Sequence, residues 1–248
     1  MIIIACYSNK GGVGKTATSV NLAYACAMSG KQTLLCDLDP QGASGFYFRI
    51  KPSRKLKKQA FFEDVDCFTG AIRGSDYDNL DLLPANMSYR DFDIFLSRMK
   101  NSRSRLKKAL KAVGNEYDVV ILDCPPNISL LSENVFKVAD KIVIPVIPTT
   151  LSERTLEQLY DFFSDKNFQK KKLLPFFSMV QKSKKLHNET IQRLQKKYKK
   201  FLQGSIPFSA DIEKMGVHRA PVLTYARKSS AAKAYRKVWD AIQVEMNL

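Results

Sequence analysis

The sequence SNKGGVGKT, residues 8–16, follows a short apolar run, Ile2–Cys6, and leads into Thr16–Ser29, where apolar and small residues recur at helical spacing. A glycine-rich turn that ends in Gly-Lys-Thr between a strand and a helix is typical of a phosphate-binding loop. Glycines let the backbone curl so that successive N–H groups point at phosphate oxygens, and the helix N-terminus adds positive potential. Lys15 would reach the β and γ phosphates, and the Thr16 hydroxyl would bind Mg²⁺. A glycine turn with an incidental lysine is the alternative interpretation.

This loop departs from the common phosphate-binding pattern near its start. The common pattern has a glycine five residues before Gly14. Here Asn9 occupies that position, and an additional lysine, Lys10, follows it. The nucleotide site predicted from the loop consists of Gly11, Gly12, Val13, Gly14, Lys15, Thr16 and Ala17.

Two acidic segments follow later apolar runs. Asp37 and Asp39 come at the end of the run that begins at Gln32. From the residues alone, these carboxylates could bind the waters of Mg²⁺ or act as bases, or they could only cap a turn. The segment DVVILD, residues 118–123, has four apolar residues and then an acid, which is the Walker-B arrangement. Asp123 would therefore hold Mg²⁺ through water from a neighbouring strand.

Apolar runs alternate with helical patterns along the chain. Further strands are expected at 80–84, 118–123, 141–147 and 173–180, and helices near 88–112, 129–139, 151–165, 187–202 and 229–246. This alternation implies an α/β fold with a mostly parallel twisted sheet flanked by helices on both faces. Together with the phosphate-binding loop it predicts a P-loop NTPase fold, as a single domain over residues 1–248. The ligand should lie beyond the carboxyl ends of the strands. Residues 49–79 fit the alternation poorly and are expected to form an irregular or mobile insertion.

Charge is the unusual bulk property, because 40 Lys and Arg residues face 24 Asp and Glu. The excess is concentrated in four windows, 51–60, 98–111, 166–200 and 214–237. It indicates a polyanionic partner or, alternatively, a solvated basic surface that only confers solubility. The five cysteines have neither CxxC spacing nor histidine neighbours, so the sequence supports neither a disulfide framework nor a zinc site. With no run of roughly 18 apolar residues and no basic leader, a cytoplasmic protein is expected.

The run KGGVGKT, residues 10–16, resembles the deviant Walker-A signature of the ParA/MinD ATPases. In that family the early lysine crosses a dimer interface to the nucleotide of the other subunit, which implies this role for Lys10. The run DLDPQG, residues 37–42, is similar to the family's first switch, and Pro125-Pro126 resembles its second switch. The resemblance implies ATP and Mg²⁺ as cofactors, with Lys10, Lys15 and Asp39 as catalytic residues, Asp39 positioning the attacking water, and Thr16, Asp39 and Asp123 at the metal.

The resemblance covers nearly the whole chain and implies that Met179 and Pro207 lie beside the adenine. Two positions depart from the family pattern. Ala17 stands where a second hydroxyl residue is usual, which removes one phosphate contact, and Asp211 falls where a basic residue aligns. We therefore expect the residues that contact DNA to be rearranged.

The function implied by the resemblance is that of a ParA-like positioning ATPase with weak Mg²⁺-dependent activity. ATP would close a homodimer, the dimer would hold non-specific double-stranded DNA, and a cargo-associated activator protein would stimulate hydrolysis. The cargo would be a plasmid, a chromosome or another large assembly, and the protein would be cytoplasmic and nucleoid-associated. Because no helix-turn-helix segment precedes the first strand, reading of an operator sequence is not expected. The candidate DNA contacts, uninterrupted by acid, are Arg219, Arg227, Lys228, Lys233 and Arg236.

Two other functions remain open at this point. A MinD-like ATPase would bind membrane through an amphipathic C-terminal extension, but the apolar residues of the last helical pattern indicate a packed face, so no stable membrane association is expected. A metabolic P-loop enzyme or a metal-cluster carrier of the same superfamily is the third class. The carrier is disfavoured because CxxC motifs are missing, and the enzyme because no dedicated substrate pocket is evident.

Overall fold

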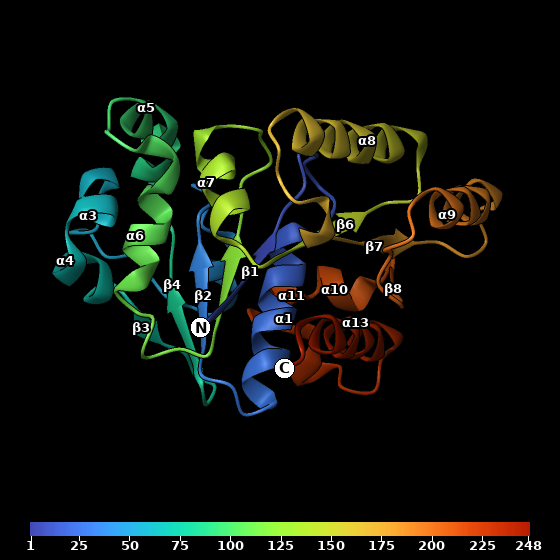
Figure 1. Ribbon diagram of the computed structural model, residues 1–248. Helices are drawn as coiled ribbons and strands as arrows, with labels where there is room; N and C mark the ends of the chain where they lie inside the picture. Colours follow the sequence, from blue (N-terminus) through green and yellow to red (C-terminus); the bar gives the residue numbers. More distant parts are fainter.

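The apolar runs of the sequence form one eight-stranded sheet in the computed structural model, which describes residues 1–248 (Figure 1). The strand order is β3-β4-β2-β5-β1-β6-β7-β8, and every neighbouring pair is parallel except β3 and β4. The strands are β1 Ile2–Cys6, β2 Thr33–Asp37, β3 Arg73–Gly74, β4 Leu80–Leu83, β5 Val119–Asp123, β6 Lys141–Val146, β7 Leu173–Val180 and β8 Ser205–Pro207. The expected mostly parallel α/β sheet is confirmed, whereas β3 and β8 were not among the expected strands.

Helices cover both faces of this sheet. The α-helices are α1 Lys15–Met28, α2 Ala43–Tyr47, α3 Lys58–Glu63, α4 Val65–Thr69, α5 Phe92–Ser97, α6 Arg105–Lys111, α7 Leu130–Val138, α8 Thr150–Asp165, α9 Lys185–Lys197, α10 Ala210–Glu213, α11 Met215–His218, α12 Val222–Tyr225 and α13 Ser230–Met246. Short 3-10 helices add η1 Met87–Asp91, η2 Ser102–Ser104 and η3 Lys170–Lys172. Helices α3 to α9 lie on one face, and α1, α12 and α13 lie on the other (Figure 1).

Successive strand side chains enter the two opposite cores. In β5, Val120 and Leu122 pack under α3 to α9, whereas Val119 and Ile121 pack against α1 and α13. Because side chains alternate across a strand, a sheet covered on both faces needs continuous apolar runs. The run at residues 119–122 is such a strand.

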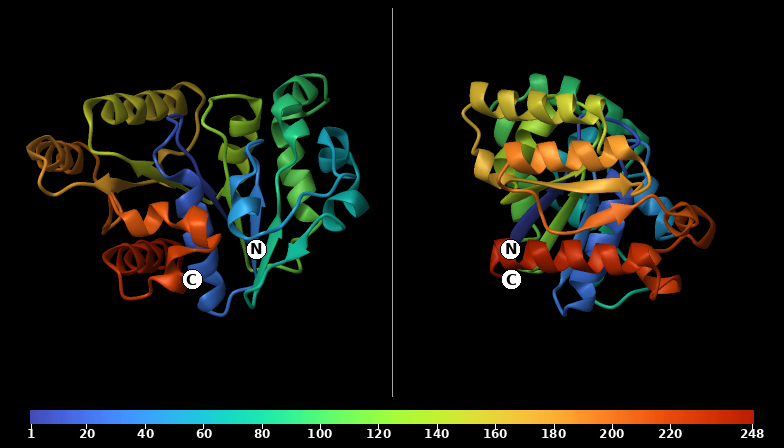
Figure 2. Two further views of the ribbon diagram at one scale, coloured as in Figure 1. Left: turned by 180° about the vertical axis from the view of Figure 1, so that it is seen from behind. Right: turned by 90° about the vertical axis from the view of Figure 1, so that its right-hand side faces the viewer.

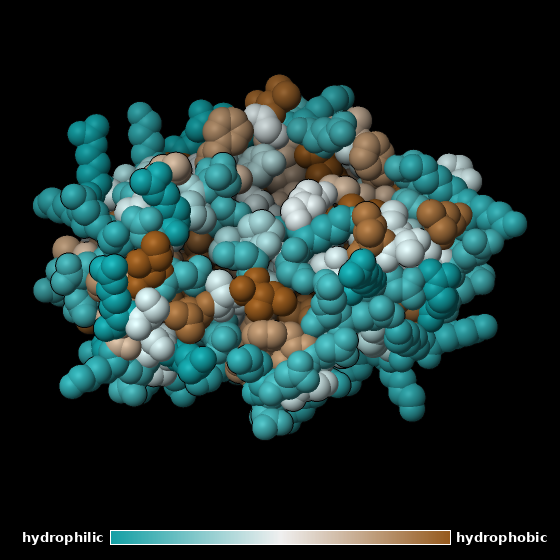
Figure 3. Space-filling model, turned by 90° about the horizontal axis from the view of Figure 1, so that it is seen from above, coloured by the Kyte–Doolittle hydropathy of each residue, from teal (hydrophilic) through white to brown (hydrophobic).

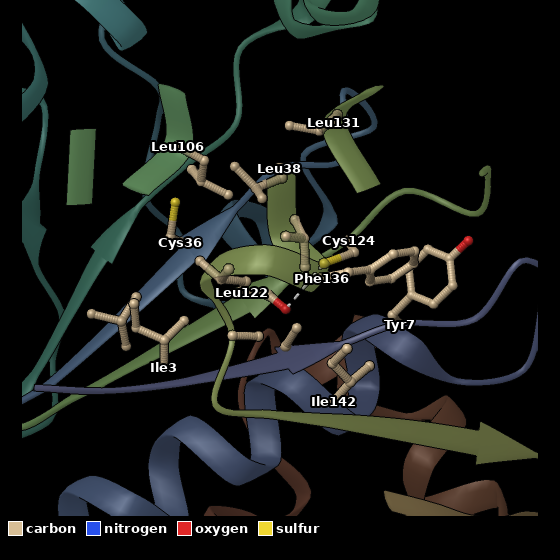
Figure 4. Packing of buried hydrophobic residues seen from close by; sticks show 14 of the residues in the cluster. Ile3, Tyr7, Cys36, Leu38, Leu106, Leu122, Cys124, Leu131, Phe136 and Ile142 are labelled. Carbon is tan, nitrogen blue, oxygen red and sulfur yellow. Dashed lines mark hydrogen bonds between the residues drawn. The ribbon is translucent and has the colours of Figure 1, made fainter. Parts of the chain in front are cut away.

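The core beneath α7 is built from aromatic and small side chains (Figure 4). The Tyr7 ring meets the Phe136 ring edge-on, with 4.8 Å between the ring centroids. Cys124 is fully enclosed in this core, and burial raises the pKa of its thiol. All five cysteines are free thiols, and Cys67 alone among them is half-buried rather than buried.

Two expectations about the segment between β2 and β5 were wrong. Residues 49–79 are not irregular: they contain α3, α4 and β3, and Phe61 is buried among aromatic rings. The expected helix at 88–112 is divided into η1, α5, η2 and α6. Asn101 interrupts it with a left-handed backbone, φ 56°, and the Asn134 amide donates to the Ser102 carbonyl oxygen at 2.8 Å.

The parallel strands share one carboxyl edge, which carries the candidate site. Both chain termini lie close together, near the edge where β1 begins (Figures 1 and 2). Helix α13 runs back from the carboxyl edge toward that end, as the side view of Figure 2 shows. The loops after β1, β2 and β5 therefore converge at the opposite edge, where a ligand of a parallel sheet is expected.

Candidate nucleotide site

The loop between β1 and α1 has the shape of a phosphate cradle. Gly12 and Gly14 have positive φ angles of 70° and 90°, a conformation that glycine adopts without strain. No protein acceptor receives a hydrogen bond from the backbone N–H groups of residues 11–17. Free N–H groups at the start of a 14-residue helix attract an anion. The loop therefore fits the phosphates of a nucleotide.

The two lysines of the loop point to different neighbours. Lys15 is buried, and its Nζ donates to the Lys10 carbonyl oxygen at 3.4 Å, within the loop. The Lys10 Nζ instead donates to the Ser152 Oγ at 3.0 Å, in the first turn of α8. Only Lys15 thus lies under its own phosphate cradle.

Two buried carboxylates lie side by side at the ends of β2 and β5, where Asp37 pairs in register with Asp123. The Ser44 N–H donates to Asp37 at 3.1 Å, and the Ser44 hydroxyl donates to Asp123 at 2.8 Å. The Ser19 hydroxyl of α1 donates to the other Asp123 oxygen at 3.0 Å. Ser44 therefore connects the segment after β2 to the Walker-B strand.

Burial governs the protonation of this pair. It raises the pKa of Asp123 to about 6, although hydrogen bonds from Ser44, Thr16 and Ser19 oppose the shift. Burial, followed by the charge of Asp123, raises the pKa of Asp37 well above its usual value. Two adjacent buried carboxylates favour a nearby cation, because it relieves their repulsion.

The oxygen donors at this edge fit Mg²⁺. Thr16 offers a hydroxyl and Asp123 a carboxylate, which are the hard oxygen ligands that this ion prefers. No group of three or more His, Cys, Asp or Glu side chains is arranged to hold a metal by itself. Such a partial ligand set suits an ion that also keeps waters and phosphate oxygens.

Asp39 forms a turn in this structure. Its carboxylate accepts the Gln41 N–H at 3.0 Å, and its carbonyl oxygen accepts the Gly42 N–H at 2.9 Å. The turn geometry is the alternative that the residues alone left open. The assignment of Asp39 to the attacking water and to the metal remains a prediction.

The candidate adenine residues follow the next strands of the sheet. The Ser178 hydroxyl of β7 donates to the Val13 carbonyl oxygen at 3.0 Å, which attaches this strand to the phosphate loop. Met179 has a positive φ of 53°, and Pro207 of β8 pairs with Val180. Met179 therefore lies beside the loop, and Pro207 one strand farther along the sheet.

Comparisons with known proteins identify the family. A family model described as an AAA domain matches residues 1–176. The sporulation initiation inhibitor protein Soj of Bacillus subtilis is 32% identical over 240 residues, which cover 94% of each chain. A ParA family protein of Mycoplasma genitalium is 31% identical, with 96% of this chain and 88% of the relative covered. The chain belongs to the ParA family of P-loop ATPases.

A solved structure shares the whole fold of this ParA-family chain. A protein from Mycobacterium smegmatis, described as cobyrinic acid a,c-diamide synthase with bound ADP and magnesium, is 26% identical and superimposes with a TM-score of 0.83. The match covers 100% of this chain and 96% of the other. The expected P-loop NTPase fold is therefore confirmed.

The candidate DNA contacts of the ParA-family chain lie around its C-terminal helices. Arg227, Lys228, Lys233 and Arg236 are exposed, and the Arg236 guanidinium donates to the Arg227 carbonyl oxygen at 2.9 Å. Arg219 lies apart from this group, because its guanidinium covers the Phe46 ring of α2. None of the eight ion pairs in the molecule involves a residue of 214–237.

Sequence reasoning missed Ser19 and Ser44, whose hydroxyls hold Asp123. Ser19 lies three residues after Thr16, on the adjacent turn of α1, which was the available signal. Ser44 follows the DLDPQG run by two residues, but nothing local indicates that it reaches across to β5.

Proposed function

We propose that this ParA-family ATPase is an ATP-dependent switch that forms a sandwich dimer, holds non-specific DNA and positions a cargo. The observation that carries the proposal is the direction of Lys10. Its ammonium binds Ser152 outside the phosphate cradle, while Lys15 already lies beneath that cradle. A lysine that its own site does not need is available to the nucleotide of a second copy.

The nucleotide of the proposed switch is ATP, taken with Mg²⁺. Residues 11–17 would hold the phosphates through backbone N–H groups and Lys15, and Met179 and Pro207 would contact the adenine. Thr16 and Asp123 would hold Mg²⁺, which when bound neutralises charge on the β and γ phosphates. Asp39 would orient the attacking water. Since no other residue there is an obvious base, we propose weak intrinsic hydrolysis.

The charge pattern supports a polyanionic partner on the C-terminal side. Some basic residues elsewhere pair with acids, among them Lys58 with Asp91, Arg193 with Glu153, and Lys197 with Glu157. The cations of 214–237 have no such partner and remain available to phosphates. Phosphate contacts bind without sequence preference, which suits nucleoid DNA.

The face seen from above in Figure 3 carries hydrophilic side chains around most of its outline, with apolar residues in separate patches. No helix combines the length and apolar character that crossing a membrane requires.

We propose that residues 1–248 act as one domain that is cytoplasmic and nucleoid-associated, without stable membrane association. A cargo-associated activator would stimulate hydrolysis and release.

The test measures mass in solution with ATP and with ADP. The parent protein should dimerise with ATP alone, and Lys10→Ala should stay monomeric while still binding ATP through Lys15. Lys31→Ala, in the loop between α1 and β2, is the matched control and should dimerise like the parent. If Lys10→Ala dimerises and hydrolyses ATP as the parent does, the proposed role of Lys10 is wrong.

A metabolic enzyme is the second candidate, and the structural similarity to a protein described as a cobyrinic acid a,c-diamide synthase favours it. Such an enzyme would turn over steadily without a protein activator. Phosphate release by the purified protein, without an activator, is the measurement that separates the two functions.

A further inference from the structure

Helix α2 stands between the buried carboxylates and the C-terminal basic segment. At its start, Ser44 donates its N–H to Asp37 at 3.1 Å and its hydroxyl to Asp123 at 2.8 Å. At its end, Phe46 meets Arg219, 173 residues farther along the chain. One five-residue helix thus contacts both the candidate metal site and a candidate DNA contact.

The Phe46–Arg219 contact has two components. The Arg219 guanidinium carbon lies 4.8 Å from the centroid of the Phe46 ring, which is a cation–π distance. The Arg219 Nε–H also donates to the Phe46 carbonyl oxygen at 3.1 Å. The Nε–H bond is the only hydrogen bond of this guanidinium within the protein, so its two terminal nitrogens remain free for a phosphate.

The backbone on both sides of the contact is constrained. A Cβ at Gly45 would come within 2.9 Å of the Ile50 carbonyl oxygen and 3.2 Å of Pro84, so α2 packs without space to spare. Gly42, just before α2, has a positive φ of 63°. Arg219 itself is left-handed, with φ 47°, at the end of α11. Because α2 is closely packed at Gly45, a shift of the helix requires its neighbours to shift as well.

We propose that Phe46 is a positioning residue that couples the nucleotide state to DNA binding by holding Arg219. The proposal rests on the proposed function, since it assumes that ATP and DNA are the two ligands. Nucleotide binding changes the surroundings of Asp37 and Asp123, and Ser44 transmits that change to α2. Phe46 then moves with α2 and carries the Arg219 guanidinium toward the DNA phosphate. The contacts form a continuous path with one small element at its centre, which is the physical basis such coupling requires.

The test compares two substitutions of Phe46. Phe46→Leu keeps an apolar side chain but removes the aromatic face, and Phe46→Tyr keeps the face. Affinity for one DNA duplex is measured with ATP and with ADP at fixed salt. A contact of this kind corresponds to about two- to fivefold in an equilibrium constant. Because a dimer contains two copies, Phe46→Leu should reduce the ATP-to-ADP affinity ratio by roughly fivefold or more, and Phe46→Tyr should keep it.

Hydrogen exchange gives a readout that does not depend on DNA. ATP should change the exchange of residues 214–220 in the parent and in Phe46→Tyr, but not in Phe46→Leu. Val217→Ala, a substitution of an exposed residue of α11, is the control and should behave as the parent. ATP hydrolysis without DNA should be the same in all four proteins, which shows that the nucleotide site is intact.

The outcomes separate this inference from the proposed function. If the parent shows no ATP-dependent DNA binding, the proposed function fails, and hydrogen exchange still decides the coupling. If the parent prefers DNA with ATP and Phe46→Leu keeps both the affinity ratio and the exchange response, the inference is overturned. Arg219→Lys keeps the charge but loses the Nε–H donor, so a reduced ratio in this variant supports the pair even if Phe46→Leu does not fold.

Discussion

The residues that act on Asp123 come from three separate parts of the chain. Ser19 belongs to α1, Ser44 to α2, and Asp37 to the neighbouring strand. Each hydroxyl satisfies one oxygen of a fully buried carboxylate, which would otherwise be costly to ionise. Asp39 is different, because it is half-buried and its carboxylate accepts only a local backbone N–H. The surroundings of Asp39 therefore differ from those of Asp123, although both are predicted to act at the metal.

Substitution of Asp39 should separate ATP binding from hydrolysis. Asp39→Ala should keep its affinity for ATP, because the loop N–H groups, Lys15 and Thr16 do not depend on it. Hydrolysis should fall about a hundredfold or more, as when a group that positions a reactant is lost. The measurements are nucleotide affinity and phosphate release, with Thr16→Ala as the contrasting variant that weakens Mg²⁺·ATP binding. Normal turnover in Asp39→Ala would leave Asp39 as a turn residue only.

At the level of elements, the segment 49–79 is part of the core. Helix α3 packs on α4 and on α6, and the ring centroids of Phe68 and Tyr89 lie 5.2 and 5.3 Å from that of Phe61. The rings meet edge-on, which favours aromatic pairs beyond the area they bury. The basic residues of 51–60 are therefore on the outside of an ordered layer.

Truncation of Phe61 should destabilise the protein strongly. Phe61→Ala removes a ring that is 1% exposed and leaves a cavity, which typically costs about 3–5 kcal/mol. Ile94→Ala on α5 is the control, because Ile94 is 58% exposed and should cost within about 0.5 kcal/mol. Denaturant unfolding measures both free energies. Equal effects of the two substitutions would contradict the ordered aromatic layer.

The basic windows are divided between the two faces of the sheet. Helix α6, with Lys107 and Lys108, belongs to one face, and the segment with Arg227 and Lys228 belongs to the other. One straight duplex cannot contact both faces of a single subunit. Comparing DNA binding after substitution of Lys107 and Lys108 with DNA binding after substitution of Arg227 and Lys228 therefore tests which face binds DNA.

Neutralising Arg227 and Lys228 together should weaken DNA binding with ATP for every sequence alike. Each phosphate contact contributes about 0.9 to the log–log salt slope, so the double variant should lower that slope by roughly 2 per subunit. ATP hydrolysis should not change. The matched control replaces Lys107 and Lys108 by Ala and should keep the parent affinity and slope. If only the control pair weakens binding, the DNA site belongs on the α6 face.

For the whole molecule, the proposed switch requires that ATP hydrolysis be delayed. The ATP-bound dimer can carry positional information only while it stays on DNA, so hydrolysis must be slow until an activator binds. The carboxylates of Asp37 and Asp123 are buried and already accept hydrogen bonds from Ser44, so neither is an obvious base for water.

Turnover of the purified protein should be well below the median enzyme kcat of about 10 s⁻¹, even with DNA present. It should rise only when an activator protein joins DNA. Steady-state phosphate release at saturating ATP and Mg²⁺ is the measurement. Turnover of tens per second without an activator would exclude a switch whose hydrolysis depends on an activator, and it would favour the metabolic enzyme.

Local patterns in the sequence were enough to predict the phosphate loop and the parallel sheet. Both depend on local patterns: glycines that permit a curled backbone, a lysine and a hydroxyl at fixed spacing, and apolar runs long enough for buried strands. The elements near 130–138, 150–165 and 230–246 were also predicted within a few residues, because their apolar periodicity is local.

Which distant side chains meet could be learned only from the folded arrangement of the strands and helices. The aromatic layer that orders residues 58–69 includes Tyr89, and Ser44 reaches Asp123 across 79 positions of sequence. Arg219 lies over Phe46, although neither side chain carries a local signal for the other. These contacts arise because the crossovers bring the carboxyl ends of nonadjacent strands to one edge, and a side chain's partner there depends on strand order rather than on its sequence neighbours.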